Sequence, residues 1–122
     1  MIKKNIIWIC SMAIVVLMLT QLYSCKKDSE ASLAVMTTTL SNITQSTATC
    51  VGNLSSTGGA TITEKGFCWS TNQNPTVDDN KAIVKTDLAH FTDTITGLNP
   101  NIAYYVRSYA INSKGIAYGN EQ

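Results

Sequence analysis

Residues 33–122 alternate between short strand-like runs and clusters of turn residues, and no other feature constrains the fold as strongly. The runs are rich in Thr, Val, Ile and Tyr, which favour strands, and none repeats with a helical period. The stretches between them, such as 56–59 and 97–100, contain the Gly, Asn and Pro residues of tight turns. The predicted strands are 35–40, 47–54, 61–70, 81–85, 91–96, 103–112 and 116–118.

The length and spacing of these runs predict one all-β domain. A chain of this size buries about 60% of its unfolded surface and builds a single core. Short strands separated by frequent turns are typical of a β-sandwich. We therefore expect one sandwich at 33–122, with a final strand that is short.

The charged residues argue against binding to nucleic acid. The chain has 9 Lys and Arg residues against 8 Asp and Glu residues, and Lys3 and Lys4 lie at the extreme N-terminus. A protein that grips phosphates needs a basic stripe or patch. The basic residues of the predicted domain are instead scattered along it: Lys65, Lys81, Lys85, Arg107 and Lys114.

The N-terminus has the pattern of an export signal. Lys3 and Lys4 precede an apolar run at 6–22, and small Ser24 stands directly before Cys25. This resembles a bacterial lipobox, which implies cleavage before Cys25, acylation of that cysteine and attachment to a membrane. Residues 1–24 are then a signal peptide and 25–32 a flexible, polar tether. The alternative is an uncleaved transmembrane anchor, for which the apolar run is at the short end of the usual range.

Charged residues directly after the cysteine resemble the sorting signals of some outer-membrane lipoproteins. Asp28 and Glu30 form this acidic pair. The resemblance implies an outer-membrane lipoprotein that faces the periplasm or the cell surface.

The stretch 96–110 resembles the corner and following strand of a fibronectin type III domain, in which Leu, Pro and Tyr keep fixed offsets. The resemblance implies a seven-stranded, immunoglobulin-like β-sandwich. It also implies that Leu98 plugs the end of the core, that Pro100 stiffens the corner and that the Tyr104 hydroxyl bonds back to the preceding loop.

The sequence departs from that family in two places. The second predicted strand lacks the core tryptophan of animal modules, and we expect Trp69 to fill the resulting space above Gly52. The final strand also ends early, with two residues after Asn120. We expect a truncated strand, which leaves its neighbour partly unpaired and with an exposed edge.

Cys50 and Cys68 leave two arrangements open. They lie on strands that a fibronectin-like sandwich places in opposite sheets, so a disulfide across the core requires both to face inward. If Trp69 faces the core instead, the alternation of side chains along a strand turns Cys68 away from Cys50, and both remain shielded thiols. A zinc site needs four ligands, and His90 is the only histidine. We expect neither a metal nor another cofactor.

Tyr105, Arg107 and Tyr109 alternate with the expected core residues of their strand. We expect them to project from the outer face of a sheet, where aromatic rings beside a cation suit a glycan or a protein partner. The alternative is that cross-strand contacts use these side chains to shield the sheet.

No set of residues in the chain forms a recognisable catalytic pattern, so the expected protein is not an enzyme. We expect a lipid-anchored spacer or interaction domain of a surface protein. Two alternatives remain open. One is direct adhesion to a glycan or protein, and the other is the front end of an anchored carbohydrate-active enzyme whose catalytic domain lies beyond Gln122.

Overall fold

The computed structural model describes residues 31–122, which form two antiparallel sheets packed as a β-sandwich. The expected signal peptide, the expected lipidation site Cys25 and most of the expected tether lie outside the described residues. No helix within 31–122 is long and apolar enough to cross a membrane. The three-stranded sheet contains β1 (Leu33–Ser41), β2 (Ala48–Thr57) and β5 (His90–Ile95). The four-stranded sheet has the order β4 (Asn80–Ile83), β3 (Ile62–Ser70), β6 (Tyr105–Asn112) and β7 (Gly115–Tyr118).

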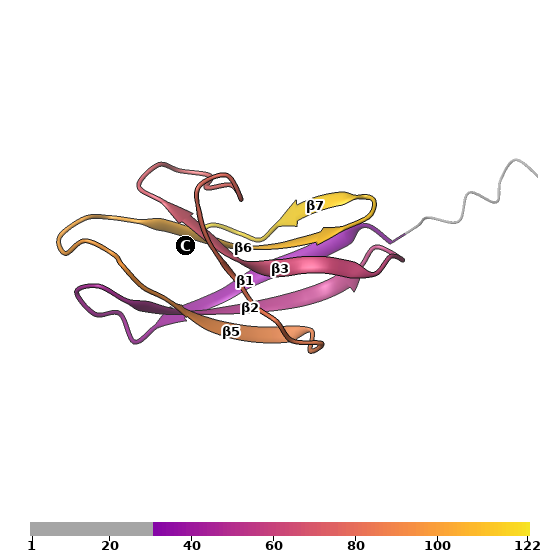
Figure 1. Ribbon diagram of the computed structural model, residues 1–122, viewed down its shortest axis with the longest axis horizontal. Helices are drawn as coiled ribbons and strands as arrows, with labels where there is room; N and C mark the ends of the chain where they lie inside the picture. Colours follow the sequence, from indigo (N-terminus) through magenta and orange to yellow (C-terminus); the bar gives the residue numbers. More distant parts are fainter. Residues whose placement is uncertain (1–30) are drawn as a thin grey trace, which may run out of the picture.

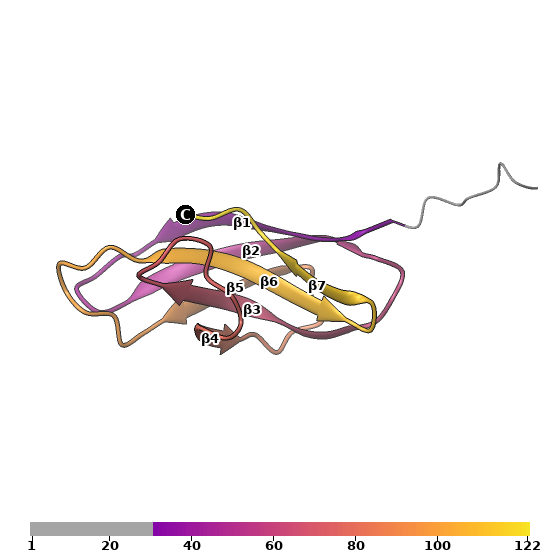
Figure 2. The same cartoon turned by 90° about the horizontal axis from the view of Figure 1, so that it is seen from above.

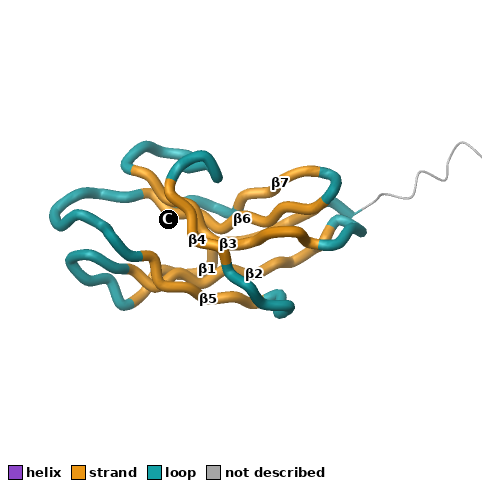
Figure 3. The backbone as a smooth tube through the Cα atoms, viewed as in Figure 1, coloured by secondary structure: helices purple, strands orange, loops and turns teal. Residues whose placement is uncertain are grey.

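Each of the predicted strand ranges overlaps an observed strand, because period-two burial and turn chemistry agree along the chain. In β2, the buried positions Ala48, Cys50 and Gly52 alternate with half-exposed ones. Gly58 and Gly59 adopt positive φ angles of 67° and 72° at the turn into β3, a conformation that favours glycine. Figures 2 and 3 show the two layers and the loops that join their strands.

The core lies between the sheets and centres on two phenylalanines. The rings of Phe67 and Phe91 are 5.2 Å apart, and both side chains are fully or almost fully buried. This tilted contact is a favourable arrangement for aromatic pairs. The other buried apolar members are Val35, Ala48, Cys50, Ile95, Val106 and Ala110.

The expectation for Trp69 is corrected by the environment of Gly52. A Cβ atom on Gly52 would lie 2.6 Å from the Phe91 ring, so Phe91 occupies the space above this glycine. Phe91 reaches it directly, because the two residues face each other on neighbouring strands. Trp69 is half-buried and packs against the margin of the core.

The expectation of an unpaired edge beside the last strand is also corrected. After β7, the backbone N–H of Gly119 donates to Ser108, and Gln122 exchanges two hydrogen bonds with Val106. Between these contacts β6 has one residue, whereas the C-terminal segment has two, Asn120 and Glu121. The extra residue makes a β-bulge, which redirects both side chains. Pairing along β6 therefore continues past the end of β7.

Candidate binding surfaces

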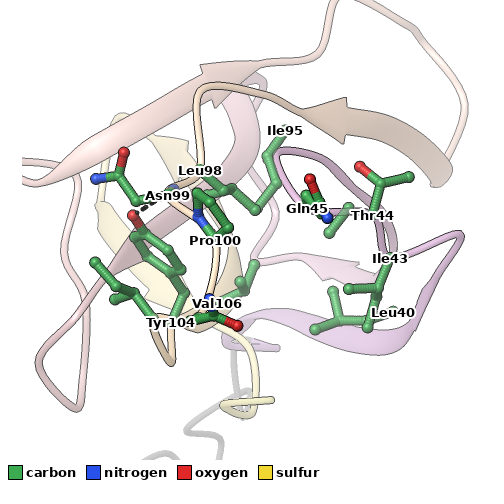
Figure 4. A pocket seen from close by; sticks show the side chains of 13 residues that line it. Leu40, Ile43, Thr44, Gln45, Ile95, Leu98, Asn99, Pro100, Tyr104 and Val106 are labelled. Atoms are coloured by element: carbon green, nitrogen blue, oxygen red, sulfur yellow. Dashed lines mark hydrogen bonds between the residues drawn. The ribbon is translucent and has the colours of Figure 1, made fainter.

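An apolar groove of about 570 Å³ opens at one end of the sandwich. It lies between the β1–β2 loop (42–47) and the β5–β6 loop (96–104), which are tied together by a hydrogen bond of 3.0 Å from Leu98 N–H to the Ser46 carbonyl. Figure 4 shows Leu40 and Ile43 on one side of the groove and Pro100, Tyr104 and Val106 on the other. The remaining lining residues are Thr44, Gln45, Ala48, Ile95, Leu98, Asn99, Asn101 and Ile102.

Tyr104 fixes the β5–β6 wall of this groove. Its hydroxyl accepts a hydrogen bond of 3.0 Å from the backbone N–H of Asn99 (Figure 4). Leu98 is half-buried against the core, and Pro100 is exposed on the wall. Asn101 has a positive φ of 60°, a conformation that asparagine tolerates better than most residues. The corner is thus held by a side-chain bond at a chain reversal that regular strand pairing does not reach.

The groove presents apolar surface without charge. Ile43 is 70% exposed and Ile102 is 47% exposed, and none of the lining residues is Lys, Arg, Asp, Glu or His. Large exposed apolar side chains beside a concave surface are typical of an interaction site. Neither isoleucine was predicted to be functional from the sequence. An isoleucine inside a predicted turn could have indicated an exposed apolar contact there.

The expected binding surface on β6 is covered by the chain itself. Tyr109 is completely buried, whereas Tyr105 and Arg107 are half-buried. The Tyr109 hydroxyl donates to Glu64 over 2.6 Å, and burial together with this carboxylate raises the pKa of Tyr109. For Tyr109 the structure therefore has the second of the two arrangements considered, in which a cross-strand contact uses the side chain to shield the sheet.

The cover is the β3–β4 connection, residues 71–79, which we call the strap. Arg107 donates hydrogen bonds to the backbone carbonyls of Asn74 and Pro75, and its guanidinium lies 4.0 Å from the centre of the Tyr118 ring. The Tyr118 hydroxyl accepts from Val77 N–H at 3.2 Å. The redirected Glu121 accepts from Asn74 N–H. The Arg107 guanidinium is therefore engaged by the strap and by Tyr118, and is not free to bind a ligand.

The two cysteines are free and buried on different sides of the four-stranded sheet. Cys50 belongs to the core. Cys68 lies beneath the strap, where its thiol contacts the carbonyl oxygen of Pro75 at 3.5 Å. Burial raises the pKa of each thiol to about 11, and for Cys68 nearby Arg107 opposes part of that rise. Of the two arrangements left open by the sequence, the structure has separate thiols.

Lys65 is a third residue whose role was not predicted from the sequence. It is only 6% exposed and shares the inward face of β3 with Phe67. Its ammonium group lies 5.5 Å from the centre of the Phe91 ring and donates to the backbone carbonyl of Leu88. This side chain supports the β4–β5 loop. Alternation along β3 could have predicted its burial, since Lys65 falls on an inward position.

The remaining candidates lie apart from the groove. His90 is exposed at the start of β5. Among residues 31–122 no cluster of three or more His, Cys, Asp or Glu side chains has the arrangement of a metal site. The chain matches no protein-family model, and no curated protein matches it.

Proposed function

We propose that this chain is a non-catalytic, lipid-anchored module of a bacterial cell envelope whose fibronectin type III-like sandwich presents a binding groove. Two observations support the fibronectin-like type. The strand order places β1, β2 and β5 in one sheet and β4, β3, β6 and β7 in the other. The hydrogen bond between Tyr104 and Asn99 is that of a tyrosine corner.

The main support for the proposal is that the groove and the start of β1 lie at opposite ends of the sandwich. β1 begins at one end, and the groove between 42–47 and 96–104 lies at the opposite end (Figure 1). A strand as long as β2 spans about 30 Å. An anchor attached before β1 would therefore hold the groove at roughly that distance from the membrane, beyond the reach of the short tether alone.

The chemistry of the groove favours a protein partner over a glycan. Ile43 and Ile102 offer apolar contact, while Arg107 is held by the strap and Tyr109 is buried. Burying a charge against such a lining would leave it unpaired, which is unfavourable. The preferred occupant is an uncharged segment with apolar side chains.

Acyl labelling tests the anchor. We expect a fatty-acid label on Cys25 of the full chain, and we expect Cys25→Ser to lose both the label and retention in the membrane fraction. A full chain that is retained in membranes without any acyl label would contradict the lipid anchor.

Photo-crosslinking in cells tests the groove. A photoreactive residue at Ile43 should give a discrete crosslinked protein product, and Ile102→Asn should remove it. The same reagent at Ser113, at the opposite end, is the control and should give no such product. A product of equal yield from both positions, or one insensitive to Ile102→Asn, would contradict recognition through the groove.

A further inference from the structure

The outer face of the three-stranded sheet is free of charged side chains. Cross-strand pairing sets its outward residues in three rows. The rows are Met36, Asn53 and His90; Thr39, Val51 and Thr92; and Ser41, Thr49 and Thr94. Met36 is 54% exposed, and the threonines of β5 are exposed as well. Exposed sheet faces in soluble proteins ordinarily carry Lys, Glu or Arg.

The charge of this domain lies elsewhere. The four-stranded sheet carries the Lys81–Glu64 ion pair, at 2.9 Å, and the strap-bound Arg107. In β5, Asp93 falls on the inward side with Phe91 and Ile95, and so leaves the outer rows uncharged. Depletion of charge is characteristic of the buried centre of a protein interface.

We propose that this charge-free face pairs with the same face of a second copy of the chain within one membrane. The proposal rests on the lipid anchor proposed above. Two identical neutral faces meet without burying an unpaired charge. Copies anchored at the same end present the face at the same height above the membrane, so a two-fold axis along the membrane normal turns the two faces toward each other.

One pair of hydroxyl groups on this face is partnered within the sheet. The Thr49 and Thr94 hydroxyl oxygens are 3.2 Å apart and share a hydrogen bond across the strands. Covering such a pair costs less than covering an unpartnered hydroxyl. Val51 stands in the middle row of the middle strand, where the symmetry axis would pass, and its apolar side chain would meet its own counterpart.

The area of the face explains why the pairing needs a membrane. Three strands about 4.8 Å apart, over the six-residue length of β5, offer about 300 Å² per copy. Two copies would bury about 600 Å², which is well under the roughly 1,200 Å² of stable complexes. A shared membrane supplies the missing affinity, because it raises the effective concentration of each copy for the other.

Cysteine crosslinking of the full, lipidated chain in vesicles tests the pairing. Val51→Cys, treated with a short bismaleimide, should give a product of twice the chain mass. Lys81→Cys, on the opposite sheet, is the matched control and should remain monomeric. A Val51→Cys product that contains a different protein, or equal dimer yields at both positions, would overturn the proposal.

Charge substitution provides the second variant. In copies crosslinked through Thr39→Cys, Val51→Lys or Val51→Glu alone should lower the dimer yield about tenfold or more, because Val51 meets its own counterpart and like charges would face each other. Co-expression of the two variants should restore the yield. Loss without restoration would overturn the pairing. Membrane retention and acyl label, measured in the same samples, separate this failure from failure of the anchor itself.

Discussion

Thr37 of β1 supplies the hydrogen bond that the β6 backbone would otherwise lack. The Ser108 N–H donates to the Thr37 hydroxyl over 2.8 Å, and the two side-chain oxygens are 3.1 Å apart. The β-bulge after Gly119 has displaced the strand carbonyl that would normally accept this N–H. The bulge also turns Asn120 so that its amide oxygen accepts from Thr37 N–H at 3.1 Å. One threonine therefore links the two sheets.

Replacing this threonine should destabilise the domain. Thr37→Val keeps the shape of the side chain but leaves the Ser108 N–H buried without a partner. We expect a loss of about 1–3 kcal/mol in the free energy of unfolding, measured in urea. Thr39→Val, on the exposed outer face, is the control and should change stability by less than about 0.5 kcal/mol. Equal effects from the two variants would contradict the role assigned to Thr37.

Adding a side chain at Gly52 should destabilise the domain while Phe91 is present. A Cβ at this position would lie 2.6 Å from the ring, so Gly52→Ala should cost about 1–3 kcal/mol through overpacking. In a Phe91→Leu background the added cost should be smaller, since the clashing ring is gone. Thermal unfolding of the four proteins measures this coupling. Strictly additive effects would show that Phe91 does not fill the space above Gly52.

The tyrosine corner should contribute one ordinary hydrogen bond. Tyr104→Phe removes the acceptor for Asn99 N–H, and we expect a loss of about 0.5–1.5 kcal/mol. The control is Tyr105→Phe, because the Tyr105 hydroxyl has no hydrogen-bond partner among residues 31–122. Denaturant midpoints compare the two. A Tyr105 variant that is as destabilised as the Tyr104 variant would show that the corner bond is not what stabilises this region.

Stability in acid should depend on Glu64. Hydrogen bonds from Tyr109 and then from Lys81 hold the pKa of this carboxyl below its ordinary value of 4.5. A carboxyl whose pKa is lowered in the folded state stabilises folding above its unfolded pKa, and this contribution disappears as the pH falls through the folded pKa. The stability difference between the parent chain and Glu64→Gln should therefore be constant near neutral pH and shrink below about pH 4.5.

Tyr109→Phe offers the matched comparison for this acid transition. It keeps Glu64 ionisable but removes the strongest of its hydrogen bonds. The acid-dependent loss of stability should then be smaller, and complete at a higher pH, than in the parent chain, because the folded pKa of Glu64 lies closer to the unfolded one. Identical acid profiles for the parent chain and Tyr109→Phe would contradict the assigned cause.

The thiols of Cys50 and Cys68 should be unreactive in the native state. Alkylation requires the thiolate, and pKa values of about 11 leave little of it at pH 8. We expect peptide mapping to find both cysteines unlabelled by iodoacetamide in native protein and fully labelled in denaturant, without prior reduction. Labelling in denaturant only after reduction would instead indicate a disulfide.

Local pattern was sufficient to predict the strands, whereas the corner was expected from the resemblance to fibronectin type III domains. Alternation along β6 identified inward positions such as Val106, because adjacent side chains on a strand point to opposite faces. The same rule correctly related Cys68 to Trp69. It did not predict the exposure of Tyr109, because alternation assigns a side chain to a face but does not say what covers that face.

The sequence by itself determined an all-β domain, its strand ranges and the hydrogen-bonded corner at Tyr104, because these depend on residues close together in the chain. Only the tertiary structure decided that Phe91 fills the space above Gly52, that the strap is held by Arg107, and that the bulge directs Asn120 to Thr37. The groove belongs with these, since it forms between loops far apart in sequence. Such contacts depend on how segments far apart in the sequence are brought together in space, and no local pattern of residues encodes that arrangement.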